Sequence, residues 1–293
     1  MRVEIALGNE MVDGFLLVPD GEGPFPAVLV LYYDAQTGVG LGSALRDYGW
    51  HLAKRGFVTL SIGKPNSGVD LEEPGKARGG TYLGPVNEPV RVQPLSALAY
   101  AAANAHTVLA QRPDVDAEWI GVVGHSFGGK WGLFASCLHN EFACAAWSDP
   151  GIVFDERDRR KENPGGSVNY FDVWYLGFEL GEMNDPAKRY SFRRHPDEVK
   201  QRTGSYKALV EGGHDLVELH ALMAPRPFFV SGGTADMKER WPALNHAIAV
   251  NRLLGHENRV AMANRPTHGP TQEDNEQVYR FFEWWLKPKQ PPQ

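Results

Sequence analysis

Cysteine is almost absent from this sequence, which contains only Cys137 and Cys144 in 293 residues. They do not form a CxxC pair, and two cysteines cannot supply a disulfide framework, so neither a disulfide-stabilised fold nor a thiol redox motif is expected. We expect both side chains to pack in the core. The scarcity mildly favours a reducing compartment.

Other absences exclude whole classes of function. No block rich in lysine and arginine occurs and the net charge is −6, so no nucleic-acid partner is expected. No apolar run reaches the roughly 18 residues of a transmembrane helix, so no membrane role is expected. No HExxH motif or cluster of His and Cys ligands occurs, so we expect no metal and no cofactor.

The first residues, MRVEIA, alternate like a short strand and do not resemble a signal peptide. We therefore expect a cytoplasmic protein. Secretion or a periplasmic location is the alternative if a leader peptide has been removed.

What is present is a regular alternation of strand and helix patterns. Apolar runs typical of buried strands cover 27–33, 57–62, 119–123, 142–148, 227–231 and 259–263, and helical patterns cover 42–55, 91–111, 215–223, 240–254 and 271–287. Two short antiparallel strands are expected at 2–6 and 12–18. This order predicts an α/β fold with a doubly wound, mostly parallel sheet of about eight strands. We expect one domain, 1–293.

Residues 151–214 break the alternation and are interpreted as a cap inserted over the carboxyl edge of the sheet. The charged run at 155–162 is interpreted as a solvated face. An aromatic cluster at 170–178 is either a small satellite core or a pocket wall. Within it, Trp174 and Tyr175 are candidate substrate-pocket residues together with Tyr32.

The most informative motif is Gly124-His-Ser-Phe-Gly128, which fits G-x-S-x-G. A buried-strand pattern precedes it and a helical pattern follows it, which is the context of a nucleophile elbow. Glycines at 124 and 128 remove the collisions that so tight a turn would otherwise cause. Ser126 is therefore the candidate nucleophile, held at the carboxyl edge of the sheet.

A serine hydroxyl needs a base within hydrogen-bond reach, and in this topology acid and histidine follow the nucleophile in the chain. His268 is the only histidine in the loop between the last strand and the last helix. Asp236, just beyond strand 227–231, is the preferred acid. Asp149, at the end of strand 142–148, is the rival for that role, and it is otherwise a residue that shapes the pocket.

The oxyanion of acyl transfer needs two or more preorganised donors. One is expected to be the backbone N–H of Phe127, directly after the nucleophile. The second is expected from the loop after strand 27–33, hence from Tyr33 or Asp34. A tyrosine hydroxyl is a further candidate, because Tyr32-Tyr33-Asp34 stands where many such enzymes carry His-Gly-Gly.

With these residues in place, the whole chain resembles an α/β-hydrolase. The segments VDGFLLVP (12–19) and GPFPAV (23–28) resemble the dienelactone-hydrolase and acetyl-xylan-esterase branch, and DLVELHALMAPRP (215–227) is similar to a segment of glucuronoyl esterases. Dienelactone hydrolases usually carry cysteine where this chain has Ser126, and Phe127 stands where glucuronoyl esterases carry arginine. Some of these relatives place the triad acid at the position of Asp149.

These features predict a serine hydrolase that cleaves carboxylic esters through an acyl-enzyme. Short-chain or carbohydrate-linked esters are the expected substrates. A peptidase of the prolyl-oligopeptidase type is one alternative, although the chain leaves no room for the accompanying propeller. The other is a non-catalytic binding protein with the same fold.

Overall fold

The computed structural model describes residues 2–7, 10–64, 94–153 and 204–287. In this part of the chain, eight strands form one sheet in the order β1-β2-β4-β3-β5-β6-β7-β8. The strands are β1 (Arg2–Leu7), β2 (Glu10–Leu17), β3 (Phe25–Leu31), β4 (Val58–Ile62), β5 (Val115–His125), β6 (Cys144–Ser148), β7 (Phe228–Gly232) and β8 (Val260–Asn264). The β1–β2 and β2–β4 pairs are antiparallel. The six strands β3 to β8 run parallel to one another.

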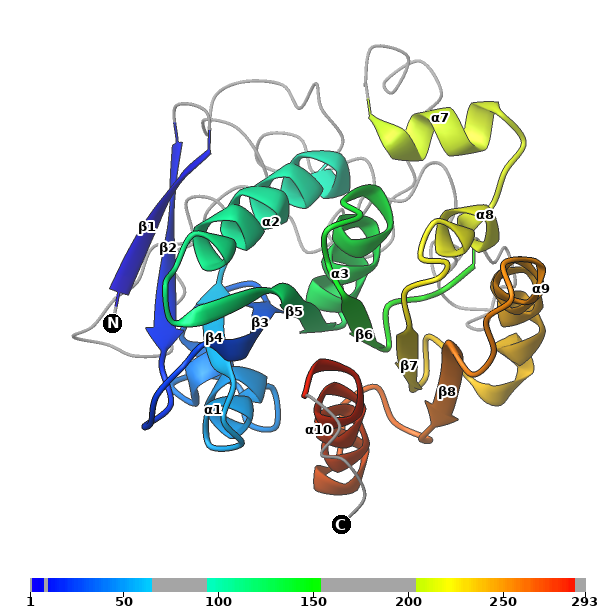
Figure 1. Cartoon of the computed structure of the whole chain (residues 1–293). Coiled ribbons are helices and arrows are strands. Elements are labelled where there is room, and N and C mark those ends of the chain that lie inside the picture. The colour runs from blue at the N-terminus through cyan, green and yellow to red at the C-terminus, as the bar shows by residue number, and fades with distance from the viewer. Residues whose placement is uncertain (1, 8–9, 65–93, 154–203, 288–293) are drawn as a thin grey trace, which may run out of the picture.

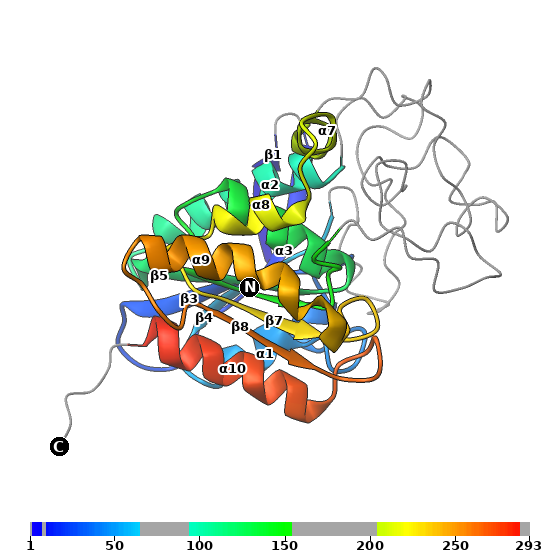
Figure 2. The ribbon, with the colours of Figure 1, turned by 90° about the vertical axis from the view of Figure 1, so that its right-hand side faces the viewer.

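Helices cover both faces of the sheet (Figures 1 and 2). One face carries α1 (Tyr48–Ala53) and α10 (Gln272–Leu286), and the other carries α2 (Pro94–Ala110), α3 (Phe127–Leu138), α8 (Leu216–Ala221) and α9 (Asn245–Leu253). The shorter elements are η1 (Thr37–Val39), α7 (Ser205–Glu211) and η3 (Lys238–Leu244). The expected doubly wound, mostly parallel sheet is confirmed.

The central strands are buried because helices pack against both of their faces. All five residues of β4, β6 and β7 are buried, including the polar Thr59 and Ser61 of β4, as is usual for parallel strands that are covered on both faces. The indole of Trp147 on β6 stacks on the ring of Phe228 on β7, with the ring centroids 4.5 Å apart. Cys137 and Cys144 are both buried free thiols.

Several element boundaries differ from the sequence-based expectation, and two of the differences have a local reason. The helix expected over 240–254 is split, because Pro242 lies in η3 and the regular helix α9 begins only at Asn245. The helix expected over 42–55 is shorter: α1 spans Tyr48–Ala53, and Leu45 before it has a φ of 61°, which a right-handed helix does not allow. The strand expected at 119–123 begins earlier, at Val115.

Most of the expected cap lies outside the described residues, so its form stays a prediction. Its last part forms α7, which is joined to α2 by a hydrogen bond of 2.9 Å from the Ser205 backbone N–H to Ser96 Oγ. Among the described residues, no helix combines the length and the apolar character needed to cross a membrane.

Candidate active site

Ser126 occupies the sharp turn between β5 and α3, at φ 56° and ψ −116°. Few side chains adopt this backbone region, so the strain must be held by the surroundings. A Cβ at Gly128 would lie 2.0 Å from the carbonyl oxygen of Leu31, and one at Gly124 would lie 2.1 Å from the carbonyl oxygen of Gly128. The two glycines therefore allow the close approach of strand, turn and helix that a nucleophile elbow requires.

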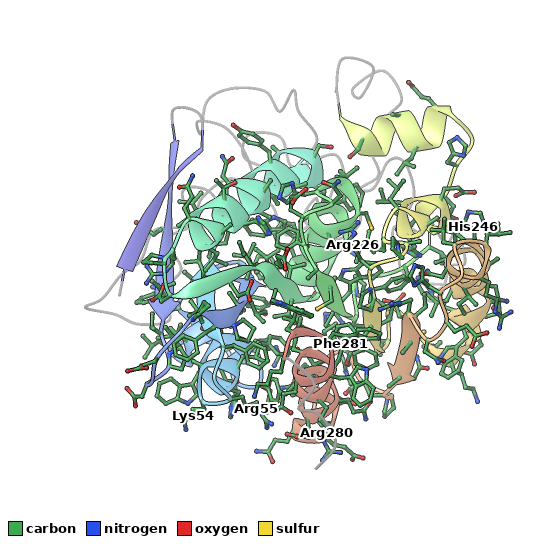
Figure 3. The ribbon with its side chains drawn as sticks, in the orientation of Figure 1. Lys54, Arg55, Arg226, His246, Arg280 and Phe281 are labelled. Atoms are coloured by element: carbon green, nitrogen blue, oxygen red, sulfur yellow. The ribbon has the colours of Figure 1, made fainter. Side chains whose placement is uncertain are left out.

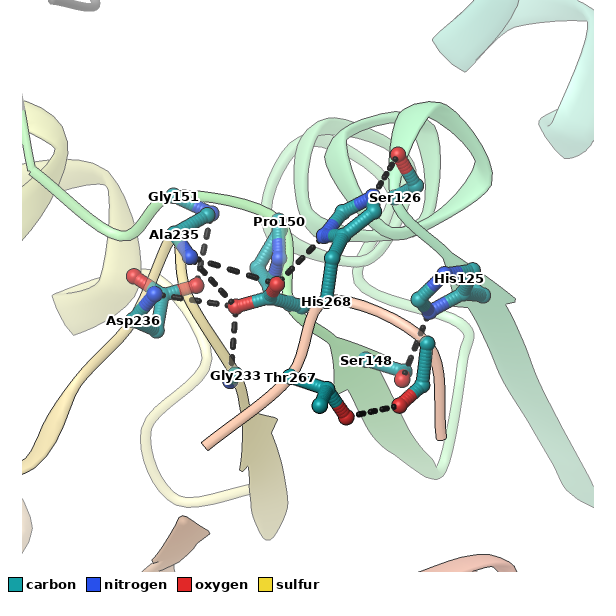
Figure 4. Close-up of polar contacts among 12 residues, drawn as sticks. His125, Ser126, Ser148, Pro150, Gly151, Gly233, Ala235, Asp236, Thr267 and His268 are labelled. Carbon is teal, nitrogen blue, oxygen red and sulfur yellow. Dashed lines mark hydrogen bonds and ion pairs between the residues drawn. The ribbon is translucent and has the colours of Figure 1, made fainter. Parts of the chain in front are cut away.

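The sheet brings the candidate residues together at the carboxyl ends of its parallel strands. His268, in the loop between β8 and α10, places Nε2 2.8 Å from Ser126 Oγ (Figure 4). Its other ring nitrogen, Nδ1, lies 2.5 Å from Oδ2 of Asp149, which directly follows β6. Serine, histidine and aspartate thus form one continuous hydrogen-bonded chain.

Asp149 is held by backbone donors as well as by His268. Its Oδ1 accepts hydrogen bonds from the backbone N–H groups of Gly233, Ala235 and Asp236 at 2.7, 3.0 and 2.9 Å. Burial raises the pKa of Asp149, but His268 and the N–H groups of Ala235 and Gly233 outweigh it and leave the pKa lowered. The fully buried carboxylate is therefore kept ionised beside the imidazole.

The expectation that Asp236 is the partner of His268 is corrected by this geometry. Asp236 lies in the turn after β7, as expected, but its carboxylate points away from His268 and accepts hydrogen bonds from the backbone N–H groups of Gly151 and Ile152 at 2.6 and 2.7 Å. Arg240 lies 3.5 Å from it. Each aspartate thus binds the backbone of the loop that carries the other, and only Asp149 faces the histidine.

The two aspartates also differ in the direction in which their pKa values are shifted. Asp236 is 0% exposed, and burial together with the nearby charge of Asp149 raises its pKa despite the opposing effect of Arg240. A carboxyl with a raised pKa and no contact with the imidazole is poorly suited to stabilise an imidazolium. The physical reason for the misassignment is the φ of 50° at Asp149, which lets the chain turn sharply after β6.

The expected oxyanion residues lie beside one another across the elbow. The ring of Tyr33 stacks on the ring of Phe127 with centroids 5.0 Å apart, and the Tyr33 carbonyl accepts a hydrogen bond from the Lys64 backbone N–H. The Asp34 carboxylate accepts from the backbone N–H and the hydroxyl of Thr37 at 2.8 and 3.1 Å. Its side chain is therefore engaged in the turn, and the role of this loop in binding an oxyanion stays a prediction.

Of the candidate pocket residues, the structure describes only Tyr32. Its half-buried ring meets Tyr33 edge-on, with centroids 5.1 Å apart. Burial raises the pKa of Tyr32 and Arg46 partly offsets that rise, so the phenol stays neutral at physiological pH. Trp174 and Tyr175 lie outside the described residues.

Two residues of this site were missed by reasoning from the sequence. His125 lies against His268 with the ring centroids 4.8 Å apart, and its Nδ1 is 3.0 Å from Ser148 Oγ. Arg265 is buried directly after β8 and donates hydrogen bonds to the loop that carries His268. Neither residue type carries a sequence signal that separates a buried partner from a surface side chain.

No group of three or more His, Cys, Asp or Glu side chains is placed to hold a metal ion in the part of the chain that the structure describes. What the site offers is a strained serine, a histidine with its two nitrogens divided between serine and acid, and an ionised aspartate. That arrangement suits nucleophilic attack assisted by a general base.

Among known proteins, the chain is similar to solved structures, whereas comparisons of its sequence found no match. No protein-family model and no curated protein sequence matches it. Its structure is similar to that of a glucuronoyl esterase from Solibacter usitatus, with 20% identity and a TM-score of 0.62, covering 98% of this chain and 81% of that one. A CE15 glucuronoyl esterase from Caldicellulosiruptor kristjansonii matches at 21% identity and a TM-score of 0.61, over 97% of this chain and 76% of that one.

A 2,6-dihydroxy-pseudo-oxynicotine hydrolase is also similar, at 13% identity and a TM-score of 0.58, over 98% of this chain and 68% of that one. These identities are too low to carry an activity across, but the likeness spans almost the whole chain. Together with the strand order and the elbow, it shows that the chain has the α/β-hydrolase fold.

Proposed function

We propose that this protein is a serine hydrolase of carboxylic esters, with Ser126 as nucleophile, His268 as general base and Asp149 as the acid. The observation that carries the proposal is the hydrogen-bonded chain in which His268 spans 2.8 Å to Ser126 Oγ and 2.5 Å to Asp149 Oδ2. The α/β-hydrolase fold supports it, because the elbow is the nucleophile position of that fold.

The roles follow from how the hydrogen bonds are shared. Asp149 is an ionised acceptor, so His268 carries its proton on Nδ1 and leaves Nε2 free to take the proton of Ser126. Ser126 Oγ then attacks the ester carbonyl, and the Phe127 N–H with a backbone N–H of the 33–34 turn stabilises the oxyanion. His268 returns the proton to the leaving alcohol, and a water activated by the same imidazole cleaves the acyl-enzyme.

The substrates proposed are short-chain or carbohydrate-linked esters. Two of the similar structures are glucuronoyl esterases, which supports sugar-linked esters as the first class to test. This chain carries Phe127 after the serine, so an apolar ring stacked on Tyr33 occupies that side of the elbow.

The test combines a fluorophosphonate label, peptide mass mapping and a panel of p-nitrophenyl esters of increasing acyl length. The label is expected on Ser126, with turnover of short-chain esters. Ser126→Ala is expected to lose the label and about three or more decades of kcat while keeping its thermal midpoint. A folded Ser126→Ala variant with full activity would refute the mechanism, and preferential turnover of peptide p-nitroanilides would favour the peptidase alternative.

A further inference from the structure

Arg265 directly follows β8 and precedes the candidate base by three residues, yet its side chain is only 2% exposed. We propose that Arg265 is a positioning residue that fixes the loop of His268 against the ends of β6 and β7, and so sets the base relative to Ser126 and Asp149. This inference rests on the proposed function for its catalytic consequence, and on the contacts below for its geometry.

All five N–H donors of the guanidinium have acceptors. On the loop side, Nε donates to the Gly269 carbonyl at 3.0 Å and Nη2 donates to the His268 carbonyl at 2.7 Å. On the sheet side, Nη1 donates to the carbonyl and the hydroxyl of Ser231, both at 2.9 Å, and Nη2 donates to Ser148 Oγ at 3.3 Å. One planar group therefore joins the loop to two neighbouring strands.

The anchors on the sheet side are themselves in register with the elbow. Ser148 on β6 pairs with His125 on β5 and with Ser231 on β7, and the Ser126 backbone N–H donates to the Ser148 carbonyl at 2.7 Å. The same strand end thus holds the nucleophile through its backbone and Arg265 through its hydroxyl. Displacing the guanidinium would move the base and leave the nucleophile in place.

Arg265 holds the backbone of His268 and not its ring, which is 45% exposed and is held by Ser126 and Asp149 through its two nitrogens. On its inner side the His268 ring meets the ring of His125, which burial keeps neutral by lowering its pKa to about 2, with His268, Arg46 and Arg265 acting in the same direction and Asp149 opposing. The positive charge of Arg265 is balanced by Asp274, whose Oδ2 lies 4.0 Å from Nε.

A lysine cannot replace this group. Its ammonium is a point donor on a flexible stem, whereas the guanidinium presents donors in a rigid plane in several directions at once. With Arg265→Lys, the loop keeps a positive charge but loses the fixed direction of its carbonyls. A displacement of about 1 Å in a catalytic group lowers kcat by roughly 100-fold, and this is the effect expected for the variant.

Arg226 provides a matched control, because it is also a partly buried arginine that binds backbone carbonyls (labelled in Figure 3). It precedes β7 and its side chain joins that end of the strand to the end of α3, remote from the triad. Its acceptors are the carbonyls of Ser136, His139, Phe142 and Leu222.

The experiment compares Arg265→Lys and Arg226→Lys in the full chain. Ester kcat is measured per active site, with the sites counted by titration to completion with fluorophosphonate. KM and the thermal midpoint are measured for the same samples. Arg265→Lys is expected to lower kcat about 100-fold with KM changed by less than about threefold, while Arg226→Lys lowers the thermal midpoint and leaves kcat per titrated site unchanged. Equal losses of kcat in both variants, or an unchanged kcat in Arg265→Lys, would overturn the inference.

A substrate-free readout separates this inference from the proposed function. The downfield proton resonance of the His268–Asp149 hydrogen bond is expected to shift or broaden in Arg265→Lys and to persist in Arg226→Lys. If the parent protein hydrolyses no ester, the proposed function fails, and this resonance alone decides the positioning role. If Arg265→Lys does not fold, Ser231→Ala, which removes one anchor hydroxyl, is expected to lower kcat several-fold with KM unchanged, and an unchanged kcat there refutes the role.

Discussion

Replacing Asp149 by asparagine turns one oxygen of the carboxylate into an amide NH2, and the surroundings decide which one. Oδ1 accepts hydrogen bonds from the N–H groups of Gly233, Ala235 and Asp236, whereas Oδ2 faces His268. An NH2 at the first position would confront three buried donors, at a cost of about 1–3 kcal/mol for each donor left without an acceptor. The amide oxygen will therefore face the backbone and the NH2 will face the imidazole.

That orientation changes the tautomer of His268. An NH2 group can only donate, so Nδ1 of His268 becomes an acceptor and the ring proton moves to Nε2. Nε2 then donates toward Ser126, 2.8 Å away, and cannot take its proton. In a Ser-His-Asp triad the wrong tautomer costs about 10⁴ in kcat, which corresponds to about 5.5 kcal/mol in the activation free energy.

The assay is ester kcat per titrated site for Asp149→Asn, with Asp236→Asn as the comparison. Asp236→Asn keeps the triad contacts but disturbs the hydrogen bonds to Gly151 and Ile152, so it is expected to reduce stability to urea by about 1–3 kcal/mol and to change kcat by less than tenfold. If Asp149→Asn retains kcat within tenfold while Asp236→Asn loses three decades, the assignment of the acid is refuted.

Two further outcomes follow from the packing and from the buried histidines. Gly128→Ala places a Cβ 2.0 Å from the last carbonyl oxygen of β3, so it is expected to cost about 1–3 kcal/mol in urea unfolding and to slow fluorophosphonate labelling; a stable, fully reactive variant would contradict this. Burial lowers the pKa of His106, His125 and His220 to about 4, 2 and 3. A histidine in the unfolded chain titrates near 6.5, so below that pH the unfolded chain binds more protons than the folded chain. The free energy of unfolding therefore falls as the pH drops below that value. Burial also lowers the pKa of His139, so four histidines act in this sense. The raised pKa of Asp236 acts in the opposite sense at the acidic end. His220→Phe, at a ring whose two nitrogens are buried and find no hydrogen-bond partner among the described residues, is expected to remove about a quarter of the loss between pH 7 and pH 5 in thermal unfolding, and an unchanged loss would refute the assignment.

Much of the fold was predictable because it follows from local pattern. Mostly apolar runs predicted the parallel strands, helical spacing predicted most helices, and the glycine spacing around Ser126 predicted the elbow. The boundaries that shifted depend on single residues, such as Pro242 within η3, whose effect the periodicity of a long window hides.

The candidate site was predictable only as far as topology decides it. His268 is specified by its loop, and the structure places it against Ser126. Two aspartates follow strands at the same edge, however, and topology treats Asp149 and Asp236 alike. What separates them is a set of backbone N–H directions and one positive φ, which no side-chain pattern records. Arg265 was missed for the same kind of reason, since its acceptors are mostly carbonyls.

The strand order has a consequence for when the protein becomes active during its synthesis. Ser126 and Asp149 follow the adjacent strands β5 and β6, but His268 follows β8, the last strand in the sheet order, 142 residues after the serine. Under the proposed mechanism, a chain still emerging from the ribosome, or one whose β8 and α10 have come away, holds a nucleophile without its base. Such a chain is inert toward esters, so ester turnover measures only the molecules in which β8 has joined the sheet.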